Sequence, residues 1–110
     1  MQKSKIETYL GFCIRSGKLT FGTDNIEKQK KGVWLLIADD ALKENSRKLM
    51  FTLREKFSCP LVFTGEGVLG ELTHRPAVKA AAVKERNLAA AILSEAERDG
   101  QFKIYSGGEN

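Results

Sequence analysis

The chain has 110 residues, a formal charge of +4 from 18 basic and 14 acidic residues, and a hydrophobic content of 42%. This length fits one domain, and the apolar content is sufficient for a buried core, which excludes intrinsic disorder. No apolar run reaches the length of a membrane span or signal-peptide core, so we expect a soluble cytoplasmic protein. The mild basic excess favours a polyanionic partner without requiring one.

Cysteine and histidine are scarce in this chain. The two cysteines, Cys13 and Cys59, form no CxxC pair, and His74 is the single histidine. Because a Cys/His zinc site usually needs four ligands, we expect neither a metal centre nor a cofactor. Both cysteines have apolar neighbours, which predicts that they are small buried hydrophobic residues.

Helical and strand patterns alternate along the chain. Apolar spacing predicts helices over 3–16, 24–31, the stretch between Asp40 and Pro60, 65–72 and 88–98, the last capped by Asn87. Short apolar runs predict strands over 18–21, 33–38, 61–63 and 77–83. This order predicts an α/β fold, a three-layer α/β/α sandwich with a four-stranded mixed sheet. Residues 1–100 are expected to form one domain and 101–110 a flexible C-terminal tail.

The second predicted helix is unusually polar. Between Thr23 and Lys31 its only large apolar residue is Ile26. A helix in a small domain normally has an apolar stripe, so this one is either a solvated surface or a contact surface for a polar partner. Asp24 and Glu27 resemble a capping box, with Thr23 as the competing N-cap.

This helix follows Gly22, so its first backbone N–H groups are open to a phosphate. Lys18, Lys28 and Arg75 would add cationic contacts if the fold brings them together. The segment is therefore the first candidate for a binding surface.

Two further motifs bear on enzymatic chemistry. Asp39 and Asp40 follow an apolar strand, where paired carboxylates can hold magnesium in phospho-acceptor domains. The alternative, which we favour, is that Asp40 caps the following helix. Residues 65–70 match a GxGxxG pattern, but the chain is too short for a dinucleotide domain. We interpret this pattern as a tight turn followed by a closely packed short helix.

Several segments together resemble a known family. Gly22 to Lys28, then Gly32, an apolar strand and Ala38-Asp39-Asp40 resemble the kink-turn RNA-binding ribosomal proteins, the archaeal L-seven-Ae and eukaryotic L-thirty-e group. The stretches Pro60-Leu61-Val62, Leu69-Gly70 and Arg75-Pro76-Ala77-Val78 agree with it. Leu10-Gly11-Phe12 with Arg15-Ser16-Gly17-Lys18 looks like the small bacterial members. The resemblance covers about residues 5–95.

The resemblance implies an RNA surface made from the start of the second helix and the loop before the last strand. In the family, Gly-x-Asn-Glu-x-x-Lys opens that helix, its amide and carboxylate contact sheared G·A pairs, and its lysine contacts the RNA backbone. Here Gly22 and Lys28 match, whereas Asp24 and Asn25 carry the carboxylate and the amide in reversed order.

The sequence therefore predicts a non-enzymatic RNA-binding protein. Its expected partner is structured RNA with a kink-turn-like internal loop, either ribosomal or ribosome-associated and connected to translation, with no DNA and no membrane. The expected RNA-binding residues are Lys18, Gly22, Thr23, Asp24, Asn25, Lys28, Lys31, His74, Arg75, Pro76, Ala77 and Val78.

Two alternatives remain open at this point. One is a protein-interaction module on the same fold without RNA binding. The other is a metal-dependent phospho-acceptor domain using Asp39 and Asp40. The sequence is silent on the oligomeric state.

Overall fold

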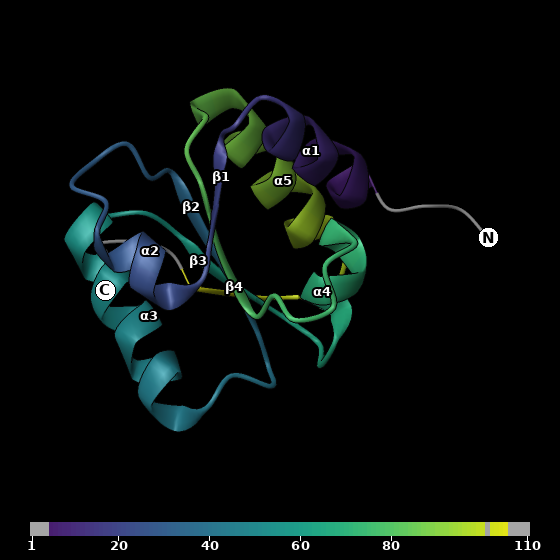
Figure 1. The fold of residues 1–110 in the computed structure, drawn as a ribbon. Coiled ribbons are helices and arrows are strands. Elements are labelled where there is room, and N and C mark those ends of the chain that lie inside the picture. Colours follow the sequence, from purple (N-terminus) through teal and green to yellow (C-terminus); the bar gives the residue numbers. More distant parts are fainter. Residues whose placement is uncertain (1–4, 101, 106–110) are drawn as a thin grey trace.

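The computed structural model describes residues 5–100 and 102–105, which form one mixed sheet with helices on both faces (Figure 1). The strand order is β1-β4-β2-β3-β5; β2 and β3 are parallel, and the other neighbours are antiparallel. The elements are α1 (Lys5–Arg15), β1 (Leu19–Phe21), α2 (Thr23–Glu27), β2 (Leu35–Asp39), α3 (Glu44–Phe57), β3 (Leu61–Thr64), α4 (Val68–Thr73), β4 (Ala80–Val83), α5 (Arg86–Arg98) and β5 (Lys103–Tyr105).

Two hydrophobic cores lie on opposite faces of the sheet. On one face, α1, α4 and α5 contribute buried residues such as Leu10, Leu69 and Ile92. On the other face, α2 and α3 contribute Ile26 and Met50 among others. Alternate residues of β2 and β4 belong to the two cores, which explains why both strands are continuously apolar. The expected α/β architecture, with helices covering a mixed sheet, is confirmed.

The prediction of four strands is wrong, because β5 adds a fifth. It pairs antiparallel with β3 in the register Val62↔Ile104 and Phe63↔Lys103. Three residues carry too little pattern to predict a strand, and the pairing partner lies far away in sequence. Residues 103–105 of the expected tail therefore belong to the sheet. Phe102 is also described and packs half-buried against the core, whereas 101 and 106–110 lie outside the described residues.

Two helix starts differ from expectation. Gly22 is the N-cap of α2 and no side chain caps it, so the predicted capping box is not formed. At α5, the carboxylate of Glu85 accepts the N–H groups of Leu88 and Asn87 at 2.7 and 3.1 Å. Glu85, rather than Asn87, is therefore the cap.

The helix α2 is also shorter than expected, ending at Glu27 instead of near Lys31. No apolar residue between Ile26 and Val33 anchors a further turn to the core. Farther along, Gly32 has φ +87°, so the chain is not helical there. Within the described residues, no helix has both the length and the apolar character needed to cross a membrane.

The aromatic contacts of β5 give a test of the fifth strand. The Tyr105 ring lies 5.0 Å from the Phe51 ring and 5.8 Å from the Phe63 ring, both centroid to centroid. We expect Tyr105→Ala to lower the free energy of unfolding by about 1–2 kcal/mol, because it removes edge-to-face contacts as well as buried area. Lys103→Ala on the same strand removes an exposed side chain and should change it by less than about 0.5 kcal/mol. Equal effects of the two variants in urea denaturation would contradict this role for β5.

Candidate functional site

The start of α2 is fixed by the pairing of β1 with β4. Phe21 lies opposite Ala81, and the Gly22 N–H donates to the Ala80 carbonyl oxygen at 2.9 Å. Gly22 has φ +88°, a conformation that L side chains rarely adopt, so glycine is required where the chain turns from β1 into α2. As a result, α2 begins directly beside the segment that leads into β4.

Arg75 lies next to this helix start. Its guanidinium is stacked on the Phe21 ring, with the central carbon 4.9 Å from the ring centroid. Such stacking orients a cation while leaving its N–H groups available to an outside acceptor. The structure therefore brings Arg75 and Gly22 together, as the sequence predicts.

The loop that carries Arg75 is held by α4. A Cβ atom added at Gly70 would lie 2.9 Å from the Pro76 carbonyl oxygen, so only glycine permits this close approach. The Val78 N–H donates to the Arg75 oxygen at 2.9 Å, which closes a turn. Pro76 and Ala77 are exposed at its tip, and Val78 is half-buried against the core. The tip of the loop therefore exposes its backbone to solvent, while the ends of the loop are packed against the rest of the protein.

The polar surface of α2 is exposed. Ile26 is fully buried and anchors the helix, whereas Asp24, Asn25 and Lys28 face the solvent and Thr23 is half-buried. The Asn25 Nδ2 atom donates to the Phe21 oxygen at 3.0 Å. An amide side chain has two N–H donors and one oxygen acceptor, so this bond fixes its position and uses only part of its hydrogen-bonding capacity.

Three of the predicted site residues do not join this surface in the way expected. Lys18 precedes β1, four residues before Gly22, which is about 13 Å along an extended strand. Its carbonyl oxygen accepts the Lys84 N–H at 2.8 Å at the opposite end of the β1–β4 pair. Lys31 is exposed in the loop after α2, beyond the end of the helix.

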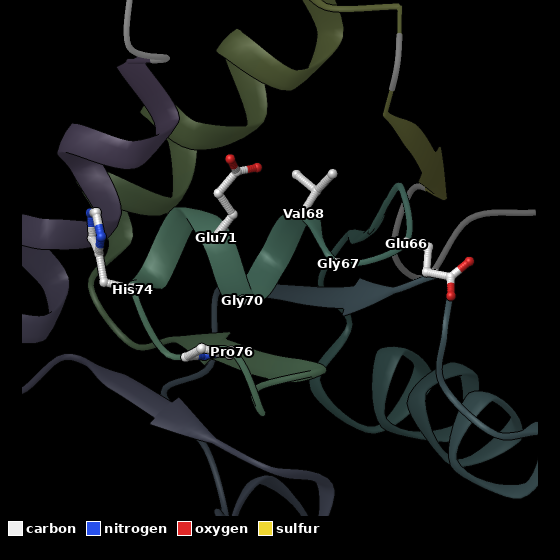
Figure 2. A pocket seen from close by; sticks show the side chains of 7 residues that line it. All are labelled: Glu66, Gly67, Val68, Gly70, Glu71, His74 and Pro76. Carbon is white, nitrogen blue, oxygen red and sulfur yellow. The ribbon is translucent and has the colours of Figure 1, made fainter.

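His74 is the third. It ends α4 with φ +58°, and Figure 2 shows its side chain directed toward α1. There its Nε2 atom lies 2.6 Å from the Glu7 Oε2 atom. The contact with α1 accounts for the position of this ring without an external partner.

Asp39 has a structural function that the sequence did not reveal. It is 1% exposed, and its Oδ1 accepts the N–H groups of Ala41 and Gly67 at 2.8 and 3.1 Å. Its Oδ2 accepts the Leu69 N–H at 3.3 Å. Asp39 thus caps α4 from a distant strand. Asp40 does not cap α3, whose N-cap is Lys43, but lies 3.8 Å from the Arg47 guanidinium.

This arrangement gives a test. Asp39→Ala leaves buried N–H groups of the chain without an acceptor, so we expect a loss of about 3 kcal/mol in the free energy of unfolding. Asp40→Ala breaks only a half-exposed ion pair and should cost less than about 1 kcal/mol. Urea denaturation of the two variants measures the difference. A larger loss for Asp40→Ala would show that the capping interpretation of Asp39 is wrong.

A shallow hollow of about 670 Å³ lies along α4 (Figure 2). Its lining residues are Glu66, Gly67, Val68, Gly70, Glu71, His74 and Pro76. Two carboxylates make it unsuited to a phosphate, and Asp39 already occupies the amides of Gly67 and Leu69. The interpretation of the GxGxxG match as a turn and a closely packed helix therefore agrees with the structure.

The two cysteines are buried thiols on opposite faces of the sheet. Burial, with a smaller contribution from Glu85, raises the pKa of Cys13 to about 11. Burial raises the pKa of Cys59 to about 12, against a smaller lowering by Arg54. Both groups are neutral at physiological pH and are not activated nucleophiles. Within 5–100 and 102–105, no group of three or more His, Cys, Asp or Glu residues is placed to hold a metal ion.

These pKa shifts predict a pH dependence of stability. Unfolded thiols ionise near 9.0, whereas the folded state keeps them protonated to about 11 and 12. Their contribution is therefore fully present below about pH 8 and is lost as the pH rises from 9 toward 12. We expect a steeper fall in the free energy of unfolding over this range than in a Cys13→Ala/Cys59→Ala variant, measured by urea denaturation. Parallel pH profiles would contradict this expectation.

Comparisons with known proteins support the fold alone. No family model matches the chain, and no curated protein sequence matches it. Among solved structures, a protein with unknown function from Bacillus halodurans is similar, with a TM-score of 0.72 and 16% sequence identity. The match covers 84% of this chain and 97% of that one.

Proposed function

We propose that this chain is a non-enzymatic protein that binds structured RNA at a kink-turn-like internal loop. The contact surface, called here the α2–loop surface, consists of residues 22–28 and 75–78. The observation that carries the proposal is the joining of these two segments by the bond from Gly22 N–H to Ala80 O and by Arg75 on Phe21. Segments distant in sequence thus present one exposed, polar surface with cations on both parts.

The packing of α2 supports a polar partner. One buried residue, Ile26, attaches the helix, and its other side chains contribute little to the cores. Lys28 and Arg75 place positive charges at the two parts of the surface. Because RNA presents a dense array of phosphates, these cations would dock its backbone, and affinity would fall with added salt.

Asp24 and Asn25 would make the contacts with the RNA bases. Asp24 is exposed in the first turn of α2, where its carboxylate can accept hydrogen bonds only, as from the imino and amino groups of guanine. Asn25 retains an oxygen acceptor and a second N–H. Adjacent helix positions differ by about 100°, so the reversed order of carboxylate and amide shifts which base each one meets.

The loop contributes backbone and cation contacts. Arg75, held over the Phe21 ring, would contact a phosphate, and the exposed tip at Pro76 and Ala77 would pack against a base that leaves the stack. Internal loops of RNA commonly supply such unstacked bases. From the resemblance of the opening segment to the small bacterial members of the kink-turn family, we propose ribosomal or ribosome-associated RNA as the source, in the cytoplasm.

The first test distinguishes phosphate contacts at the α2–loop surface from general attraction of RNA to a basic protein. We expect Lys28→Ala to weaken binding to structured RNAs of any sequence and to reduce the slope of log affinity against log salt by about 1. Lys103→Ala, on β5 at the far edge of the sheet, is the matched control and should leave the slope unchanged. Fluorescence anisotropy with labelled RNA measures both. Equal slopes for the two variants would place the contact surface elsewhere.

The second test addresses base recognition. Asn25→Ala should reduce the preference for a G·A-containing internal loop over a plain duplex by about 1–3 kcal/mol. A gel shift against a kink-turn RNA, an unkinked duplex and bulk ribosomal RNA measures this preference. Absence of RNA affinity in the unaltered chain at low salt would reject RNA binding and favour a protein-interaction module on this fold.

A further inference from the structure

A second polar surface lies at the opposite end of the β1–β4 pair. Leu19, Val83 and Leu35 occupy one register row across β1, β4 and β2. One step beyond that row stand Lys18, Lys84 and Trp34. The Lys84 N–H donates to the Lys18 oxygen at 2.8 Å, and the Trp34 N–H donates to the Val83 oxygen at 2.9 Å. The three residues are therefore neighbours across three adjacent strands.

Trp34 is exposed although it is the largest apolar side chain of the region. Its exposed fraction is 46%, whereas the adjacent Val33 and Leu35 are buried. The Arg86 guanidinium lies over its ring, 5.5 Å from the centroid, and is itself exposed. We call Trp34, Arg86, Lys18 and Lys84 the strand-end patch. It combines an aromatic face with three cations.

The cations of this patch occupy positions where their charges destabilise the fold. Lys18 and Lys84 are directly opposite across an antiparallel pair, where like charges repel. Arg86 is the first residue of α5, where the helix dipole disfavours positive charge. The acidic residue between Lys84 and Arg86, Glu85, has both carboxylate oxygens bonded to amides of α5. A bound polyanion would relieve both repulsions.

We propose that the strand-end patch binds unpaired nucleotides of an RNA chain. A base stacks on the exposed face of Trp34, and the flanking phosphates lie against Lys18, Lys84 and Arg86. Base–aromatic stacking beside a track of cations is the general solution for single strands, because every base has a flat face and every linkage has a charge.

This patch differs in chemistry and place from the α2–loop surface. The two lie at opposite ends of the same strand pair, with Gly22 beside Ala80 at one end and Lys18 beside Lys84 at the other. A structured RNA held at the first would extend a single-stranded flank along this edge of the sheet to reach the second. The inference shares only its RNA partner with the proposed function, and its test uses no kinked RNA.

Trp34 is the only tryptophan of the chain, so intrinsic fluorescence reports on the patch directly. The test titrates the whole protein with a single-stranded oligouridylate at low salt, in parallel with inorganic polyphosphate of the same total charge. We expect saturable quenching by the oligonucleotide and little quenching by polyphosphate, because only a stacked base contacts the ring. Equal quenching by the oligonucleotide and by polyphosphate would show that the patch binds by charge attraction alone, which would overturn the proposed stacking contact.

Variants separate the parts of the patch. Trp34→Ala should weaken binding of a labelled oligouridylate roughly tenfold, and Trp34→Phe should retain most of the affinity. Lys18→Thr and Lys84→Thr should each lower the salt slope by about 0.7. Arg98→Ala, at the other end of α5, is the control for Arg86→Ala and should leave the affinity for the oligouridylate unchanged.

Melting temperatures distinguish a binding role of Lys18 and Lys84 from a structural one. Because the cations oppose one another, Lys18→Thr and Lys84→Thr should leave the melting temperature equal or higher while binding weakens. Lower melting temperatures with unchanged affinity would overturn the proposal, as would unchanged affinity in Trp34→Ala. Tighter binding of a matched single-stranded deoxyoligonucleotide than of the oligouridylate would overturn the assignment to RNA. Selective binding of a protein in place of either nucleic acid would likewise overturn the proposal.

Discussion

The pairing of β1 with β4 is the constraint on which the account of this molecule depends. It brings the turn at Gly22 against Ala80 and so sets a short, weakly anchored helix beside a loop that is distant in sequence. The same pairing places Phe21 beneath Arg75. Without it, α2 would be held to the rest of the protein by the buried Ile26 and by the bond from Lys56 Nζ to the Glu27 oxygen, and its polar side chains would have no fixed relation to the loop.

The two ends of this strand pair carry polar surfaces of different chemistry. At one end, carboxylate, amide and backbone groups surround Gly22 and Arg75, and such groups distinguish base edges and RNA shape. At the other, Trp34 and its neighbouring cations offer stacking and charge, which are indifferent to sequence. Under the two proposals, one edge of the sheet specifies a folded RNA element and holds a single-stranded flank beside it. Other features contribute to the stability of the fold instead: the buried thiols, the carboxylate of Asp39 and the aromatic cluster at β5.

Local periodicity was enough to predict the alternation of helices and strands, because buried strands such as 33–38 and amphipathic helices carry their patterns within a few residues. It could not predict β5, whose pairing with Phe63 depends on a distant partner. It assigned a capping role to Asp40, whereas Asp39 bonds backbone groups some thirty residues away. Of the candidate site, the nearness of Arg75 to Gly22 was anticipated through the family resemblance. The separation of Lys18 was missed because its position depends on the direction of β1 relative to that turn.

Backbone amide chemical shifts on addition of a kink-turn RNA at low ionic strength test the central claim most directly. If the α2–loop surface binds the RNA, the largest changes fall on Gly22 to Lys28 and on the segment from Arg75 to Lys79, two stretches that only the β1–β4 pairing brings together. Residues of β3 and β5 at the far edge should change little. Changes confined to one of the two stretches, or centred on β5, would contradict a single composite RNA surface.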